Sequence, residues 1–136
     1  MSPPESSLLG AEGDALIAAA WESLGSDLRT VVEYDEETYE VLYVSEWLRD
    51  YLGEEGVEET TDDLHGYVHL DFVERDLFGR LTPGAGAVRT HITRLENATF
   101  VRYLVGDAAL FLSVDPDADL TALCAAMDEA LAAERT

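Results

Sequence analysis

The sequence predicts an α+β fold in which helices flank a single five-stranded antiparallel sheet, with the element order α-β-β-α-β-β-β-α. Helical hydrophobic spacing appears at both ends of the chain, and alternating strand patterns occur as one pair and one triplet. The turns within the pair and the triplet are too short for parallel crossovers. With 136 residues, we expect one domain over residues 11–136, preceded by a flexible Pro- and Ser-rich segment over residues 1–10.

The first half of the chain predicts a helix, a hairpin and two further helices. Apolar residues at helical spacing over residues 12–24, followed by Gly25, predict the first helix. Alternating segments over residues 28–34 and 39–44, joined by a short polar turn, predict the hairpin. The remaining elements are a short helix over residues 45–53 with a Ser cap and a Gly stop, an acidic link over residues 54–59, and a longer helix over residues 60–78.

The second half predicts three strands and a final helix. A turn-rich loop over residues 81–86 precedes strands over residues 87–95, 99–105 and 108–114. A final helix with one apolar stripe follows over residues 120–133. Because tight turns join neighbouring strands, these strands pair antiparallel. We expect the terminal helices on one face of the sheet and the middle helix on the other face or at the edge.

The charge excludes several classes of partner. The chain has 29 Asp and Glu against eight basic residues, all of them Arg, and its net charge is −21. An average surface this acidic does not favour nucleic acid or an anionic membrane, whereas the 47% hydrophobic content favours a folded core. Acids spread along a chain without Lys are typical of halophilic archaea, where molar salt screens the repulsion. An acidic interaction protein from an ordinary cell is the alternative. We expect a cytoplasmic protein without a membrane span or a disulfide.

One segment opposes this charge. Residues 77–106 contain four Arg and a single acid, Glu96, so the segment carries +3. An acid-poor stretch in such a chain has two interpretations. It is an interface for a second copy or for another protein, in which Arg pairs with carboxylates, or it belongs to the core in the middle of the sheet. An anion or nucleotide site on the Arg residues is a minor alternative. Strand alternation places Arg89, His91 and Thr93 on one face. The candidate interface residues are Arg80, Arg89, His91, Thr93, Arg94 and Arg102.

Other chemistry-bearing residues have simpler interpretations. In one continuous helix, Asp62, His65 and His69 would share a face and could hold zinc or nickel, but a solvated polar stripe is the preferred interpretation. Cys124 lies in the apolar stripe of the last helix, as a small core residue does. No nucleophile elbow or phosphate-binding loop is present. We therefore predict no catalytic residue, no metal and no cofactor.

Aromatic residues gather around the first hairpin and the short helix that follows it. Tyr34, Tyr43 and Trp47 are part of this group. They could line a ligand pocket, as in small PAS or GAF sensor domains, or form ordinary core. The sequence leaves both interpretations open, with ordinary core preferred.

The element order over residues 12–133 resembles the roadblock/LC7 fold, a relative of longin and profilin-like domains. The hairpin sequences LRTVVEYDEETYEVLYV and VRTHITRLENATFVRYLVGDAALFLSVD also resemble a group of small, uncharacterised haloarchaeal proteins. The roadblock resemblance implies a dimer that acts as a platform for small GTPases, motors or signalling complexes. We expect a non-enzymatic scaffold or regulatory protein-interaction module. A small-molecule sensor is the alternative function.

Overall fold

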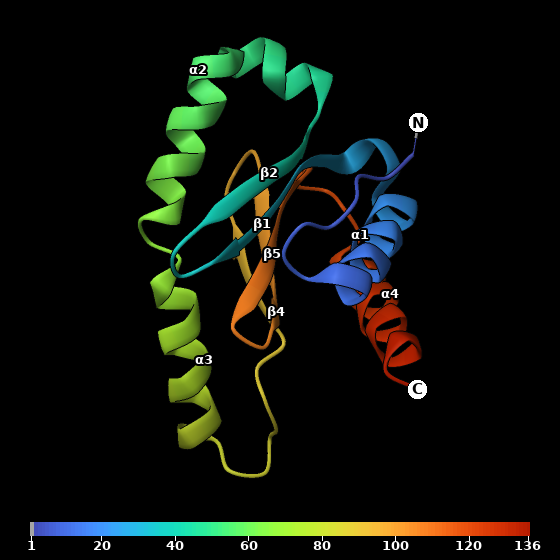
Figure 1. The fold of residues 1–136 in the computed structure, drawn as a ribbon, viewed down its shortest axis with the longest axis vertical. Helices are drawn as coiled ribbons and strands as arrows, with labels where there is room; N and C mark the ends of the chain where they lie inside the picture. The colour runs from blue at the N-terminus through green and yellow to red at the C-terminus, as the bar shows by residue number, and fades with distance from the viewer. Residues whose placement is uncertain (1) are drawn as a thin grey trace.

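The five strands form one antiparallel sheet, as predicted (Figure 1). Their order in the sheet is β2-β1-β5-β4-β3. The structure is a computed structural model that describes residues 2–136. The elements are α1 (Gly10–Leu24), a short 3₁₀ turn η1 (Gly25–Asp27), β1 (Leu28–Asp35), β2 (Tyr39–Val44), α2 (Glu46–His65), α3 (His69–Leu81), β3 (Thr90–Arg94), β4 (Thr99–Val105), β5 (Ala108–Val114) and α4 (Leu120–Glu134).

The main core lies between one face of the sheet and the two terminal helices, α1 and α4 (Figure 1). Alternate residues of the central strands point to this face, and the apolar stripes of both helices cover them. The side chains of Ile17, Leu112, Leu123 and Met127 are fully buried there. The predicted placement of the terminal helices on one face is therefore confirmed.

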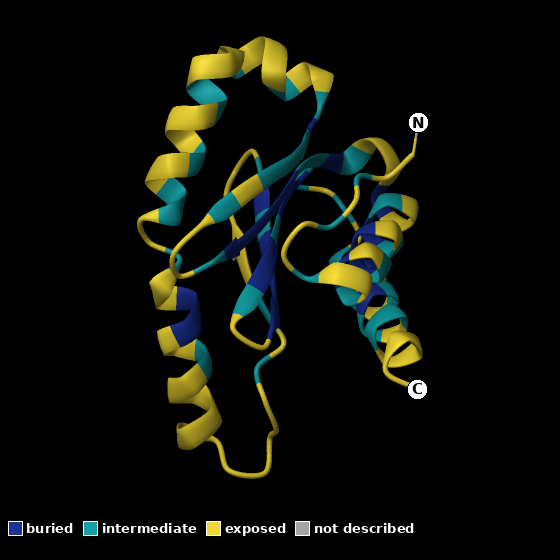
Figure 2. Ribbon diagram, viewed as in Figure 1, coloured by how far each residue is buried: buried dark blue, intermediate teal, exposed yellow. Residues whose placement is uncertain are grey.

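The other face of the sheet carries α2 and α3 over a smaller core. Its buried members are Tyr34, Phe72, Leu104 and Ala109. No residue of α2 is buried, and exposed residues dominate both helices in Figure 2. The α2–α3 layer therefore makes far fewer buried apolar contacts with the sheet than the α1–α4 layer does.

The boundary between the two middle helices differs from the prediction. The chain stays helical over residues 54–59, bending at Gly53, which has a φ of 75°. The break falls instead at residues 66–68, where the Tyr67 and Val68 amides donate to the carbonyls of Leu64 and His65. Glu has high helix propensity, so the acidic segment extends the helix, and Gly53 allows a backbone conformation that other residues rarely adopt.

Residues 6–9 of the N-terminal segment hydrogen-bond to the sheet. Glu33 of β1 is fully buried, and its carboxylate accepts hydrogen bonds from the amides of residues 7–9 and from the Ser6 hydroxyl. The Leu9 amide lies 3.0 Å from Glu33 Oε2. A side chain at Gly13 would collide with this segment, because its Cβ would lie 2.6 Å from the Cβ of Leu9. A buried carboxylate thus holds the chain immediately before α1.

Candidate functional site

The acid-poor segment identified in the sequence lies at an open edge of the sheet. β4 is an interior strand, but β3 is the last strand of the sheet and pairs only with β4. Ile92 and Leu95 are 41% and 47% exposed. The interpretation that the segment lacks acids because it lies in the middle of the sheet therefore fits β4 but not β3. The observed β3 is also shorter than predicted, because only residues 90–94 pair with β4.

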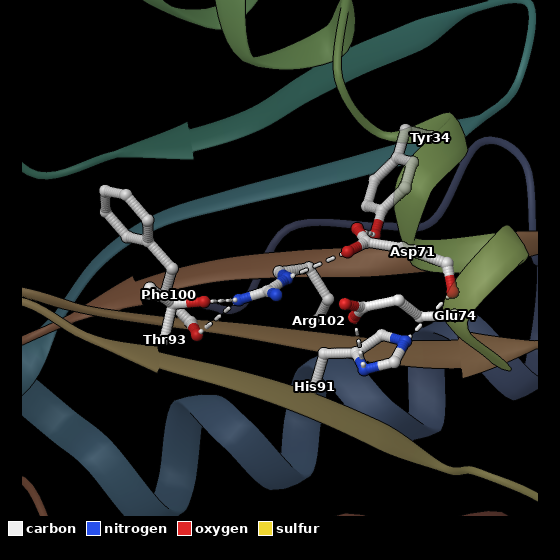
Figure 3. A network of polar contacts seen from close by, with 7 residues as sticks. All are labelled: Tyr34, Asp71, Glu74, His91, Thr93, Phe100 and Arg102. Atoms are coloured by element: carbon white, nitrogen blue, oxygen red, sulfur yellow. Dashed lines mark hydrogen bonds and ion pairs between the residues drawn. The ribbon is translucent and has the colours of Figure 1, made fainter. Parts of the chain in front are cut away.

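Three of the predicted interface residues belong to a polar network between α3 and the sheet (Figure 3). The register pairs His91 with Arg102 and Thr93 with Phe100, so these residues share the face that α3 covers. Arg102 Nε lies 3.4 Å from Asp71 Oδ1, and Arg102 Nη1 donates to Thr93 Oγ1 at 2.7 Å. The imidazole of His91 hydrogen-bonds to the Asp71 carbonyl at 2.9 Å.

Asp71 is the centre of this network. Its carboxylate is buried and also accepts a hydrogen bond from the Tyr34 hydroxyl at 2.8 Å, besides the ion pair with Arg102. Glu74, one turn further along α3, lies 3.8 Å from His91 Nδ1. The network thus connects α3 to β1, β3 and β4. The polar groups of the network hydrogen-bond to one another, so the network positions α3 on the sheet. Arg102 is bound within the chain and is not free to pair with a partner.

The other three predicted interface residues lie elsewhere. Arg89 precedes β3, and its guanidinium lies 3.3 Å from Asp128 of α4, on the opposite face from His91 and Thr93. The predicted common face of these three residues is therefore wrong: the Arg89 side chain lies beside α4, although its carbonyl still accepts a hydrogen bond from the Leu104 amide of β4. Arg80 and Arg94 are exposed, and within residues 2–136 no ion pair joins either of them to an acid.

An apolar stripe on α3 completes this surface, and the residue-by-residue sequence analysis missed it. Its members lie three or four residues apart, which is the spacing that could have revealed them. Phe78 follows Asp71 by seven residues, so it lies on the side of the helix that faces β3 and β4. We call the following exposed residues of α3 and of the open sheet edge the edge surface: Leu70, Val73, Leu77, Phe78, Leu81, Ile92 and Leu95. Ile92 alternates with His91 and Thr93 and pairs with Val101, so it points to the sheet face opposite α3.

The histidines do not form the metal site considered above. His65 ends α2 and hydrogen-bonds through Nε2 to the Asp35 carbonyl at 2.9 Å, whereas His69 begins α3. The break over residues 66–68 removes the continuous helical face that the hypothesis required. Residues 2–136 contain no group of three or more His, Cys, Asp or Glu arranged to hold a metal ion.

The aromatic residues are distributed over three places. Tyr43 packs against Trp21 on the α1 side, with ring centroids 4.8 Å apart. Tyr34 lies on the opposite side, and Trp47 is exposed on α2, where Arg29 lies over its ring. Tyr34, Tyr43 and Trp47 therefore do not line a common pocket. Cys124 is half-buried, and burial raises the pKa of its thiol, which makes it a poor nucleophile.

Alkaline pH should destabilise the fold through its two buried tyrosines. Burial, with the nearby Asp71 carboxylate, raises the pKa of Tyr34, and burial with the Asp128 hydrogen bond raises that of Tyr103. In the unfolded chain these hydroxyls ionise near pH 10, so their stabilisation is complete below that pH and is lost as the pH rises further. Urea titrations at increasing pH should show this loss.

The Tyr34→Phe variant isolates one of these groups. The variant has one fewer titrating hydroxyl, so its free energy of unfolding should fall less steeply above pH 10 than that of the unmodified chain. The two slopes should differ by about 1.4 kcal/mol per pH unit. Parallel curves for the variant and the unmodified chain would contradict the role of Tyr34.

Three solved structures share this fold. A roadblock/LC7 domain from Streptomyces avermitilis matches with a TM-score of 0.55 and 15% identity, over 88% of this chain and 92% of that one. A structure described as MglB with tetrameric arrangement matches with a TM-score of 0.59 and 18% identity, over 97% of this chain and 93% of that one. The gliding protein MglB from Thermus thermophilus matches with a TM-score of 0.56 and 16% identity, over 96% of this chain and 93% of that one. These similarities show a roadblock/LC7-like fold.

The sequence comparisons identify a domain family. A search of curated proteins gave no match. None of the helices within residues 2–136 is long and apolar enough to cross a membrane. The family described as "Domain of unknown function (DUF7522)" matches residues 14–132, which span nearly all the secondary structure described above. The chain therefore belongs to the DUF7522 family.

Proposed function

We propose that this chain is a non-enzymatic protein-interaction module that forms a homodimer through the edge surface and works in molar salt. The observation that carries the proposal is the contrast between this surface and the rest of the molecule. In a chain with a net charge of −21, five of the seven exposed apolar residues of the edge surface fall within residues 77–106, which contain a single acid. Exposed aromatic residues such as Trp47 and Tyr51 of α2 stand among many acids, whereas these five do not, and a partner that covers them best explains the difference.

The backbone of β3 supports a second copy as that partner. An edge strand presents unpaired amide and carbonyl groups, and proteins usually protect such strands with Lys, Pro or inward-pointing charges. β3 has the sequence THITR, with no Pro and no acid. Antiparallel pairing of β3 with β3 of a second copy satisfies these groups and is self-complementary, as a two-fold dimer requires.

The side chains of α3 support the same arrangement. Through His91 and Arg102, Asp71 places α3 over β3 and β4, so pairing through β3 brings two α3 helices side by side. The apolar side chains of α3 in the edge surface are then removed from water. Arg80 and Arg94 lie close by in sequence and can pair with carboxylates of the partner.

The comparisons are consistent with an assembling module. The relatives by fold are roadblock/LC7 and MglB domains, and one of them is described in a tetrameric arrangement. Folds of this kind typically serve protein interaction rather than catalysis. The buried polar network around Asp71 connects α3 to the sheet, so a structural role accounts for it.

The Leu77→Glu/Leu81→Glu variant tests the dimer. Both side chains are exposed, so the fold should tolerate the change, while the interface would have to bury four charges, two from each copy. Losing the burial of the exposed parts of four leucines corresponds to about 3–5 kcal/mol, or a rise in the dissociation constant of roughly 100-fold or more. Light scattering after size-exclusion chromatography in molar KCl should show a dimer for the unmodified chain and a monomer for the variant.

Tyr51→Glu provides the matched control. Tyr51 is also a large exposed apolar residue, at 77%, but it lies on α2, away from β3. This variant should remain dimeric. A monomeric unmodified chain at about 100 μM would overturn the dimer, and dissociation of Tyr51→Glu to the same extent would show that the edge surface is not its location.

A further inference from the structure

A cavity of about 210 Å³ lies between α2 and the sheet, on the face opposite α1 and α4. Strands β1 and β2 form its floor, Phe100 and Phe111 form one wall, and the inward side chains of α2 cover it. Its lining is mainly aliphatic and aromatic. The principal apolar contacts are Val32, Val41, Leu48, Leu64, Phe100 and Phe111.

Most polar groups around this cavity are already paired within the chain. The hydroxyls of Thr30 and Ser113 hydrogen-bond to each other at 2.7 Å, and the Thr61 hydroxyl donates to the Val57 carbonyl at 2.7 Å. His65 is bound to the Asp35 carbonyl, and Arg29 donates to the Asn97 carbonyl. A water molecule in a cavity needs two to four polar partners, so this cavity favours apolar occupants.

The charge of α2 restricts the occupant further. This helix carries eight acids and one arginine, so the cover of the cavity has a net charge of −7. Arg29, the cation at the rim, is already paired with Asp115. An anionic head group would meet repulsion and no free cation, and the lining contains no Asp or Glu to pair with a cationic one, so a neutral ligand fits best.

The cover itself is weakly attached. The α2 side chains that face the sheet, including Leu48, Leu52 and Leu64, are half-buried, and none is fully buried. They line the cavity without filling it. An occupant would add dispersion contacts and apolar burial to these half-buried side chains.

From these observations we infer that the cavity between α2 and the sheet binds a small neutral alkyl or alkylaromatic group. An apolar cavity of about 150 Å³ accommodates benzene, so this one has room for about eight carbon atoms. The inference is independent of the proposed dimer, because no residue of β3 and none of the edge surface lines the cavity.

Ethylbenzene is a suitable probe, with benzoate as its charged counterpart. Calorimetric titration in molar KCl should show saturable binding of ethylbenzene to the full chain, with at least 10-fold weaker binding of benzoate. Val41→Phe, which fills the cavity from β2, should weaken ethylbenzene binding at least 10-fold. Val73→Phe, the same change at an exposed position of α3, should leave binding unchanged.

A second measurement keeps the inference testable if Val41→Phe does not fold. In the unmodified chain, nuclear Overhauser effects should connect ethylbenzene protons to the methyl groups of Val41 and Leu64. Absence of saturable binding up to the solubility of ethylbenzene would overturn the inference. So would equal binding by folded Val41→Phe, equal affinity for benzoate, or Overhauser contacts only to the edge surface. Ethylbenzene binding should persist in the Leu77→Glu/Leu81→Glu variant. A failure of the ligand-binding inference can therefore be told apart from a failure of the proposed dimer.

Discussion

Replacing Glu33 with alanine should lower the free energy of unfolding by about 2–4 kcal/mol. Its buried carboxylate accepts hydrogen bonds from three consecutive backbone amides and one hydroxyl, all in the segment before α1. The positive end of the α1 dipole also favours an anion at this place. Without the carboxylate, residues 6–9 lose their attachment to the sheet. Urea titration in constant molar KCl, followed by circular dichroism, measures the loss.

Glu40→Ala is the matched control for this prediction. Glu40 pairs directly with Glu33 across the β1–β2 hairpin, but it is exposed. Its replacement should change the free energy of unfolding by no more than about 0.5 kcal/mol. Glu33→Gln keeps an acceptor oxygen and should fall between the two. Equal losses for Glu33→Ala and Glu40→Ala would show that the buried carboxylate does not hold the segment.

Transfer from about 3 M to 0.1 M KCl should unfold most of the protein. The Debye length then rises from roughly 2–3 Å to roughly 10 Å, so the repulsion within a net charge of −21 is no longer screened. The expected loss is about 5 kcal/mol or more, comparable with the total stability of an ordinary domain. Thermal melts across a series of KCl concentrations measure it. Full stability at 0.1 M would contradict adaptation to high salt.

A variant of α2 separates screening from other effects of salt. Glu54, Glu55, Glu58 and Glu59 are all exposed, and changing them to Gln removes four negative charges. The KCl concentration at half-unfolding should fall markedly in this variant. Sucrose, which does not screen charge, should not replace KCl for the unmodified chain. An unchanged salt midpoint in the variant would show that repulsion is not the cause.

Local patterns were sufficient for most of the fold. The β1–β2 and β4–β5 hairpins have nearly their predicted bounds, because alternating residues and tight turns act over a few residues. The final helix, capped by Asp119, also agrees with its prediction. Gly53 misled the prediction, because a glycine that usually ends a helix here bends one that continues. Whether it stops or bends depends on packing against the sheet, which sequence spacing does not contain.

The candidate site was predictable in location but not in detail. The uneven distribution of charge indicated residues 77–106, and β3 does lie at an open edge. The partners of the arginines were not predictable, since Arg102 and Arg89 pair with acids 31 and 39 positions away in the sequence. Glu33 had a usable signal, an acid in the middle of the apolar strand LRTVVEYD. Its partners in the N-terminal segment required the three-dimensional structure.

The packing of α1 against α4 has a consequence for synthesis on the ribosome. The apolar face of α1, with Leu16 and Ile17, is covered in part by α4, and Glu12 and Arg135 join the two helices although 123 positions separate them. Translation makes α1 first among the helices and α4 last. The nascent chain must therefore carry an uncovered apolar helix for most of its elongation. Protection by chaperones is most valuable during that interval, until α4 has left the exit tunnel.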